Sequence, residues 1–159
     1  MFLNKNYAQA SVAFTRAGWN REAAICDAYL LRDKARSIST TTGAARTQAF
    51  IIAANAFITL ARDSPPKQVN ERLAYYGAAG ECFSEARDLK NAGDKYRMAR
   101  RYAAAVRTYR EGGCFDEMVE VMTRHGSAID PGLVERLTTD AKLHYFEVPS
   151  NGWLSTKSV

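Results

Sequence analysis

Residues able to do acid–base or metal chemistry are few in this sequence. Its two histidines, His125 and His144, have no carboxylate or cysteine at a catalytic or metal-ligand spacing. His125 falls where an expected helix ends, and a cation there interacts favourably with the helix dipole. We predict surface or capping roles for both histidines, and a general base is the alternative.

The cysteines give no sign of a crosslink or a metal centre. Cys26, Cys82 and Cys114 lie far apart in the chain. An odd count without a close pair argues against a disulfide framework and against a zinc site. Each lies among apolar or small residues, as buried free thiols do. This usage predicts an intracellular location, with cytoplasm and nucleus both open.

Glycine-rich and acidic stretches give no nucleotide site either. GAAGE (77–81) and EGG (111–113) follow no strand pattern and match no phosphate-binding loop. Asp116, Glu117 and Glu120 cluster in the first turns of one expected helix, where acids offset the helix dipole. An acid–base pair is the alternative for them. We therefore predict no enzyme, and no catalytic, cofactor-binding or metal-binding residue in this chain.

Six basic residues with no acid between them form the one candidate binding surface. This basic patch comprises Lys95, Arg97, Arg100, Arg101, Arg107 and Arg110. On two short helices joined near Arg101, several of these side chains could share one surface and attract an acidic peptide or nucleic acid. The alternative is an ordinary solvated helix face. The interleaved tyrosines Tyr96, Tyr102 and Tyr109 are predicted to pack in the core and not to stack on bases.

The helices that would position this patch are predicted from a repeat in the sequence. Its aromatic column, Phe83, Tyr96 and Tyr109, recurs at an interval of 13 residues. Three further columns share the interval: Ala86, Ala99 and Gly112; Leu89, Tyr102 and Phe115; and Ala92, Ala105 and Met118. Spacings of three and four residues place the columns on one helical face. About 10 residues make roughly three turns and leave about three for a corner. The unit predicts short antiparallel helices with corners at Arg87-Asp88, Arg100-Arg101 and Gly112-Gly113, and Asp88 as a helix cap.

The rest of the chain also has helical patterns. In AFTRAGWNREAA, Phe14, Ala17, Asn20 and Ala23 occupy the same four columns, with Gly18 as a helix stop and Asn20 as a cap. Longer patterns cover residues 20–38, 43–62 and 67–87, and SISTTTG (37–43) offers Ser and Thr caps. Asp130-Pro131 is typical of a helix start, with Asp130 as the cap and Pro131 at the first helical position, and it predicts a last helix that reaches Tyr145.

These patterns predict an all-α protein, because no strand alternation with paired turns occurs in the sequence. The expected architecture is an antiparallel helical stack of about eight helices, a tetratricopeptide-like α-solenoid. We expect a single helical-repeat domain over residues 1–147 and a flexible tail over 148–159. No membrane partner is expected, since AFIIAANAFITLA (49–61) is too short to span a bilayer and contains Asn55.

Five phrases in order resemble a known family: AFTRAGWNREAAICDAYLLRDKA, AFIIAANAF, YYGAAGECFSEARDLKNAGDKY, AAAVRTYREGGCFDEMVEVMTRHG and LVERLTTDAKLHYF. They are similar to the helical-repeat region of large fungal proteins akin to the tetratricopeptide-and-ankyrin-repeat, UvrD-like helicase-like family. The resemblance covers roughly residues 5–147. It implies that a superfamily 1 helicase core, with ATP and nucleic acid, accompanies these repeats in a full-length protein. No helicase motif matches this sequence, so no catalytic residue carries over, and the chain resembles a fragment or a short paralogue.

Three functions remain open from the sequence. The first is a non-enzymatic scaffold that binds a peptide or protein domain, with an acidic partner favoured by the basic patch. The second is an accessory region of a superfamily 1 helicase-like ATPase, with a basic face that contacts nucleic acid. A small hydrolase on an α fold is the third.

Overall fold

The computed structural model describes the backbone of residues 2–147 and the side chains of residues 6–146, and its regular elements there are all helical. The α-helices are α1 (Phe2–Arg16), α2 (Asn20–Ser37), α3 (Gly43–Asp63), α4 (Val69–Glu85), α5 (Leu89–Met98), α6 (Tyr102–Glu111), α7 (Phe115–His125) and α8 (Pro131–Lys142). A short 3-10 turn, Gly126–Ala128, precedes α8, and a π-helical turn, Leu143–Glu147, follows it. The predicted all-α class with about eight helices is confirmed.

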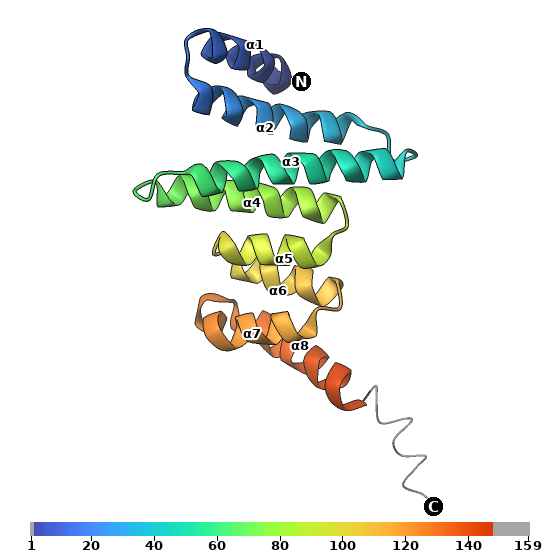
Figure 1. Cartoon of the computed structure of the whole chain (residues 1–159). Helices are drawn as coiled ribbons and strands as arrows, with labels where there is room; N and C mark the ends of the chain where they lie inside the picture. Colours follow the sequence, from blue (N-terminus) through green and yellow to red (C-terminus); the bar gives the residue numbers. More distant parts are fainter. Residues whose placement is uncertain (1, 148–159) are drawn as a thin grey trace, which may run out of the picture.

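The helices follow one another down the molecule in chain order, each running back against the one before it (Figure 1). The most extensive packing joins consecutive helices from α1 to α7, and α8 packs more lightly against α7 and α6. The short helices α5, α6 and α7 begin at Leu89, Tyr102 and Phe115, as their columns predict. The tail predicted for 148–159 lies outside the described residues.

The corners between the helices share one backbone geometry at four places. Each has one residue with positive φ: Gly18 (78°), Arg87 (61°), Arg100 (60°) and Gly113 (71°). The next residue donates its N–H to a carbonyl five positions back: Trp19 to Phe14, Asp88 to Phe83, Arg101 to Tyr96 and Cys114 to Tyr109, over 2.8 to 3.0 Å. This is the Schellman ending of a helix, which satisfies carbonyls of its last turn.

Two predicted helix caps are confirmed, and the others are wrong. Asp88 accepts a hydrogen bond from the backbone N–H of Asn91 (3.4 Å), and Asp130 accepts one from that of Leu133 (3.0 Å). Asn20 is not a cap, because the left-handed Gly18 makes Trp19 the residue that precedes α2.

The serine and threonine hydroxyls of residues 37–43 do not cap α3. Ser37 Oγ and Thr42 Oγ1 instead donate to the carbonyls of Lys34 (2.7 Å) and Ser39 (2.9 Å). The polar turn is stabilised by its own local hydrogen bonds, which compete with capping in such sequences.

The core is built from the aromatic column and from small residues beneath it. Phe83, Tyr96 and Tyr109 are buried, and the column of Ala92, Ala105 and the larger Met118 is fully enclosed. A Cβ placed on Gly80 would come within 2.8 Å of the Tyr96 ring, and one on Gly93 within 2.5 Å of the Tyr109 ring. Glycine at these two sites lets α4 approach α5, and α5 approach α6, with a tyrosine ring between them.

Within the described residues, α3 is the one helix long and apolar enough to cross a membrane by length and composition. Seven of its side chains, including Phe50 and Phe57, are buried. Because α2 and α4 pack along it, α3 has the contacts of a core helix in a stack (Figure 1).

Candidate functional site

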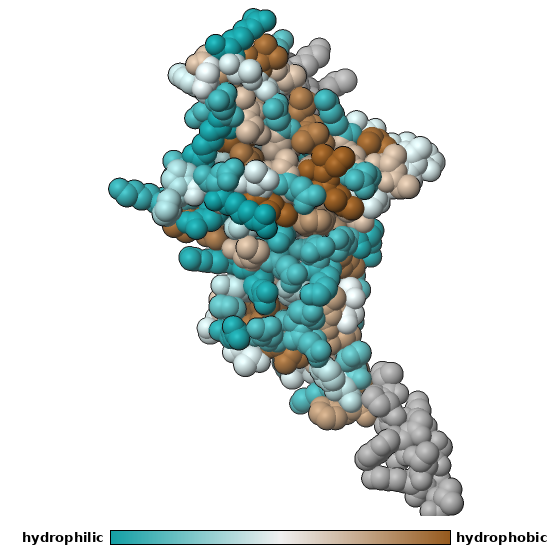
Figure 2. Space-filling view, in the orientation of Figure 1, coloured by the Kyte–Doolittle hydropathy of each residue, from teal (hydrophilic) through white to brown (hydrophobic). Residues whose placement is uncertain are grey.

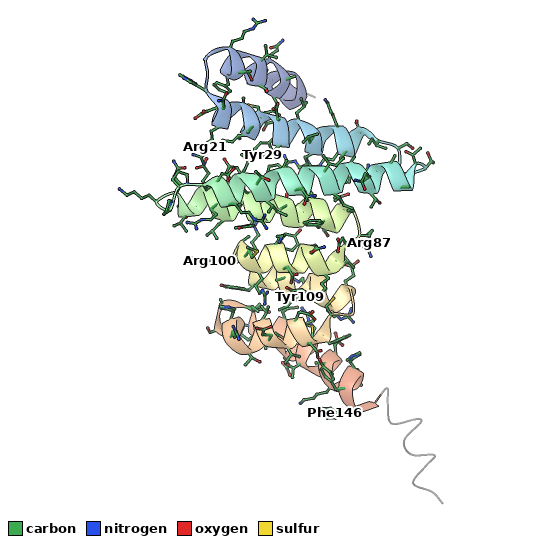
Figure 3. The ribbon with its side chains drawn as sticks, viewed as in Figure 1. Arg21, Tyr29, Arg87, Arg100, Tyr109 and Phe146 are labelled. Atoms are coloured by element: carbon green, nitrogen blue, oxygen red, sulfur yellow. The ribbon has the colours of Figure 1, made fainter. Side chains whose placement is uncertain are left out.

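The basic patch is spread over α5, α6 and the corner between them. Lys95 and Arg97 lie on α5, Arg100 and Arg101 form the corner, and Arg107 and Arg110 lie on α6. Arg101 stands at the start of α6 and Arg110 near its end, about 14 Å apart along the axis. In Figure 3, Arg100 and Arg87 lie on opposite sides of the stack, as consecutive corners must.

Three patch arginines are paired with acids on neighbouring helices. Arg97 Nη1 lies 3.7 Å from Glu120 Oε2, Arg101 Nη1 lies 3.0 Å from Glu81 Oε1, and Arg110 Nε lies 2.5 Å from Asp140 Oδ2. All six side chains are partly exposed, so each pair contributes at most about 1 kcal/mol to stability. Half of the predicted patch therefore bridges helices across the stack.

Two arginines of the basic patch line a groove with Arg136, which was not part of the predicted patch. Arg107 and Arg110 line a groove of about 430 Å³ between α6 and α8, together with Arg136 of α8. Arg107 and Arg136 have no ion-pair partner among the described residues. In the view of Figure 2 the surface over α5 and α6 is mostly hydrophilic, and hydrophobic residues reach the surface over α2 and α3.

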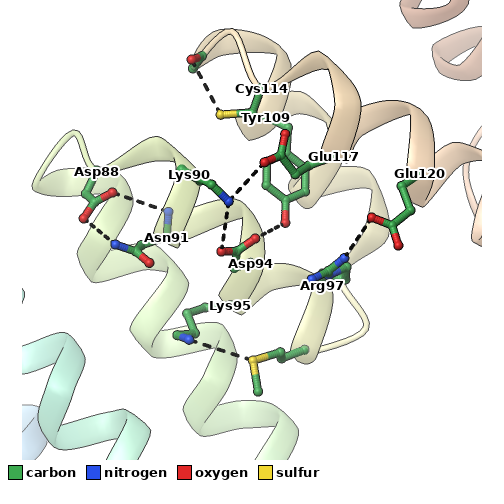
Figure 4. Close-up of polar contacts among 12 residues, drawn as sticks. Asp88, Lys90, Asn91, Asp94, Lys95, Arg97, Tyr109, Cys114, Glu117 and Glu120 are labelled. Carbon is green, nitrogen blue, oxygen red and sulfur yellow. Dashed lines mark hydrogen bonds and ion pairs between the residues drawn. The ribbon is translucent and has the colours of Figure 1, made fainter.

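A polar cluster that joins α5, α6 and α7 was not predicted from the sequence (Figure 4). Lys90 Nζ lies 3.0 Å from Glu117 Oε1 and 3.8 Å from Asp94 Oδ2, and the Tyr109 hydroxyl donates to Asp94 Oδ1 at 2.5 Å. A backbone N–H hydrogen bond and the Lys90 ammonium lower the pKa of Glu117, whereas burial and the Asp94 hydrogen bond raise the pKa of Tyr109. Every member is partnered, so the cluster holds three helices together. The spacing of Lys90 and Asp94, four residues on one helix, was the available signal.

The histidines and the acidic cluster of α7 are likewise used in contacts. The His125 ring stacks on Tyr102 at 4.0 Å, and the His144 ring stacks on Phe115 at 4.1 Å. Asp116 accepts a hydrogen bond from the Tyr145 hydroxyl, and Glu120 pairs with Arg97 and Arg124. These acids and histidines contact neighbouring residues of the stack.

The cysteines are free thiols. Cys26 and Cys82 are buried and Cys114 is half-buried. Burial is the main cause that raises the pKa of each thiol, to about 12 for Cys82. A raised pKa leaves a thiol protonated and a poor nucleophile at neutral pH. No group of three or more His, Cys, Asp or Glu side chains within the described part of the chain is placed to hold a metal ion.

A polar pocket of about 340 Å³ opens where side chains of α2, α3, α4 and α5 meet. We call it the Arg32 pocket, and its lining residues are Arg32, Arg36, Phe50, Glu81, Cys82, Ser84, Glu85 and Tyr96. No periodic pattern in the sequence relates Arg32 and Arg36 to the α4 and α5 residues that complete the lining. The pocket was therefore not predicted from the sequence.

A second, apolar groove of about 390 Å³ lies at the C-terminal end of the stack. Val119 and Met122 of α7 line it with Val134 of α8, and the π-helical turn adds Tyr145 and Phe146. Phe146 is 73% exposed and projects at this end of the molecule (Figure 3). The groove carries no charged group other than Lys142.

No family model, curated protein or solved structure matches this chain. Its function is therefore inferred from its own residues, and the resemblance to the helicase-like family stays a prediction.

Proposed function

We propose that this chain is a non-enzymatic helical-repeat scaffold, a tetratricopeptide-like α-solenoid that mediates protein–protein or interdomain interaction. The observation that carries the proposal is that many of its polar side chains form ion pairs or hydrogen bonds between helices of the stack. The acids of α7, half of the basic patch and Tyr109 all bond to neighbouring helices. Groups fixed in this way stabilise a stack and leave the grooves between its helices available to a partner.

The repeat interpretation draws support from the corners. The left-handed residues Arg87, Arg100 and Gly113 lie 13 residues apart, and each is followed by a helix start. A helix and corner of fixed length that contacts mainly its neighbours is the unit of a solenoid, and solenoids use extended surfaces for binding. The partner in this proposal is a peptide or protein domain with acidic residues, met inside the cell.

A second candidate is an accessory region of a superfamily 1 helicase-like ATPase with a basic face on nucleic acid. The observation that favours it is the convergence of Arg107, Arg110 and Arg136 on one groove. Such a cluster would attract phosphates. The ion pair between Arg110 and Asp140 in the same groove argues against this candidate, because it offsets one of the three positive charges.

A selection experiment distinguishes the two candidates. The full chain is immobilised and offered a random peptide library and, separately, a random pool of single-stranded oligonucleotides. The scaffold proposal expects enrichment of peptides that share acidic residues. A matched control uses a variant with Arg107, Arg110 and Arg136 all replaced by Gln, which should retain the selected peptides.

The opposite result would favour the second candidate. In that case oligonucleotides that bind the wild type and not the triple Gln variant are enriched, and no peptide is enriched. This result would rule out the scaffold function and support the nucleic-acid function. ATP hydrolysis by the purified chain, abolished by a substitution within it, would overturn the non-enzymatic part of the proposal.

A further inference from the structure

The Nε atom of Arg32, a residue of α2, is enclosed and has no hydrogen-bond partner among the described residues. The side chain is 17% exposed, and the nearest carboxylate oxygens, Asp33 Oδ1 and Glu81 Oε2, lie 3.9 Å from Nε and 4.0 Å from Nη1. Both distances are too long for an N–H···O hydrogen bond. Nε is therefore a polar atom kept from water without a hydrogen bond, which is costly, and the two acids offer the guanidinium ion-pair contacts without a hydrogen bond. The exposed remainder of the guanidinium is free to take a better acceptor.

Aromatic rings hold this guanidinium in place. Arg32 Cζ lies 4.9 Å from the centroid of the Tyr29 ring and 5.9 Å from that of Phe57. The two rings pack edge to face at 5.1 Å, so each restricts the other. Cation–π contacts use the face of a guanidinium and leave its in-plane N–H donors free. Tyr29 lies between α2 and α3 in Figure 3.

Charge in the Arg32 pocket favours an anion. Arg36, one turn further along α2, lines the pocket with Arg32. The two glutamates of the lining are each within ion-pair distance of an arginine from outside it. These pairs are Glu81 with Arg101 (3.0 Å) and Glu85 with Arg46 (3.3 Å). Asp33 is the remaining acid, and it lies 3.7 Å from Arg36 Nη1. Four arginines therefore surround three carboxylates, and one positive charge is left over, shared between Arg32 and Arg36.

We propose that the Arg32 pocket binds the carboxylate of an aspartate or glutamate side chain from an acidic segment of a partner protein. The proposal rests on the scaffold function and names the chemistry of its partner. The carboxylate accepts hydrogen bonds from the Arg32 guanidinium, for whose planar fork a carboxylate is the matching acceptor. Arg36 adds a second cation, and Ser84 and Tyr96 line the same space.

The geometry favours a peptide carboxylate over a nucleic-acid backbone. A pocket of about 340 Å³ has room for one acidic side chain. A nucleic-acid strand presents a continuous row of phosphates and requires a track of cations.

The test uses the full chain and the peptide acetyl-Asp-Glu-Asp-Glu-amide as the probe. The Nε–Hε signal of Arg32 is followed by ¹⁵N NMR during the titration, and affinity is measured by calorimetry. We expect a saturable shift of this signal, because a carboxylate bound to the guanidinium places a negative charge close to Nε–Hε. Arg36→Gln should weaken the affinity at least about tenfold, and so should Arg32→Lys, which keeps the charge and removes the fork.

The matched control is Lys34→Gln, which removes one positive charge from an exposed position of the same helix. It should change the affinity by less than about twofold, as expected for an exposed charge outside the site. Thermal melts confirm that each variant is folded. Arg36 is half-exposed, so its replacement separates the loss of binding from a loss of folding even if Arg32→Lys is unstable.

Three outcomes would overturn the proposal. The first is an unchanged Arg32 signal at millimolar peptide, and the second is an equal loss of affinity in all three variants. The third is displacement of the peptide by oligothymidylate with a larger Arg32 shift.

The selection experiment separates the pocket from the scaffold function. If selected peptides bind wild type and Arg36→Gln equally, the scaffold function stands and the pocket assignment falls. If the probe shifts Arg32 but no library peptide is selected, the scaffold function falls and the anion site stands.

Discussion

At the scale of single residues, two glycines of the stack lie close to tyrosine rings of the next helix. Gly93 of α5 faces the fully buried Tyr109 ring of α6, whose hydroxyl donates to Asp94. Gly80 of α4 faces Tyr96 in the same way. A ring fixed at both its face and its hydroxyl has little room to move, so the glycine sets the distance between the helices.

Gly93→Ala should therefore destabilise the protein, although alanine is the better helix former by about 1 kcal/mol. Its Cβ would lie 2.5 Å from Tyr109 Cε1, and overpacking of this kind costs about 1 to 3 kcal/mol. Urea denaturation measures the change in the free energy of unfolding. Gly43→Ala is the control, since a Cβ added at Gly43 would meet no atom within 4 Å, and it should cause no loss. Equal stability of Gly93→Ala and wild type would contradict the packing described.

At the scale of elements, the corners decide where each short helix stops. Two of the four left-handed corner residues are glycine, and the other two are Arg87 and Arg100. A residue with a Cβ is disfavoured by about 1 kcal/mol or more in this conformation. The sequence places arginine where the backbone geometry favours glycine, and the corner forms because the helices on both sides pack.

Arg100→Gly should accordingly stabilise the protein by about 0.5 to 1 kcal/mol, since its φ of 60° suits glycine. Arg107→Gly is the matched control, because Arg107 is also exposed but lies inside α6. The control should lose about 1 kcal/mol through the helix penalty of glycine. Both values come from thermal or urea unfolding. If both variants lose stability equally, the corner at Arg100 is not left-handed in solution.

The helix starts at Leu89, Tyr102 and Phe115 could be predicted from sequence because aromatic and small residues recur at one interval. The prediction of Asn20 as a cap was wrong, since the left-handed Gly18 shifts the first helical position by one residue, to Asn20 itself. The Arg32 pocket could not be predicted. Its residues come from four helices, and the lack of a partner for Arg32 Nε exists only in the folded chain.

At the scale of the whole molecule, stability should fall at alkaline pH. Burial is the main cause that raises the pKa of Tyr29, Tyr75, Tyr96 and Tyr109 above the ordinary value of 10.0. A raised pKa in the folded state contributes stability that is fully present below the unfolded pKa and is lost as pH rises above it. The urea midpoint should hold to about pH 9 and then decline steadily.

Tyr109→Phe removes one of these groups, so its midpoint should decline less between about pH 9 and pH 11 than that of the wild type. Circular dichroism at matched urea concentrations follows both proteins. Identical declines would show that Tyr109 titrates freely in the fold and is not held neutral by burial and Asp94.

The central claim is that the stack binds an acidic protein partner and not nucleic acid, and the salt dependence of binding tests it most directly. Affinities for acetyl-Asp-Glu-Asp-Glu-amide and for oligothymidylate are measured over a series of salt concentrations. If Arg97, Arg101 and Arg110 exchanged their carboxylate partners for phosphates, the basic patch would neutralise six phosphates and give a slope of about −4 in log K against log salt for a single strand. We predict a slope no steeper than about −2 for the peptide, which uses one or two ion pairs, and weaker binding of oligothymidylate at physiological salt. Tighter binding of oligothymidylate with a slope near −4, lost when Arg107 and Arg110 are replaced by Gln, would contradict the account.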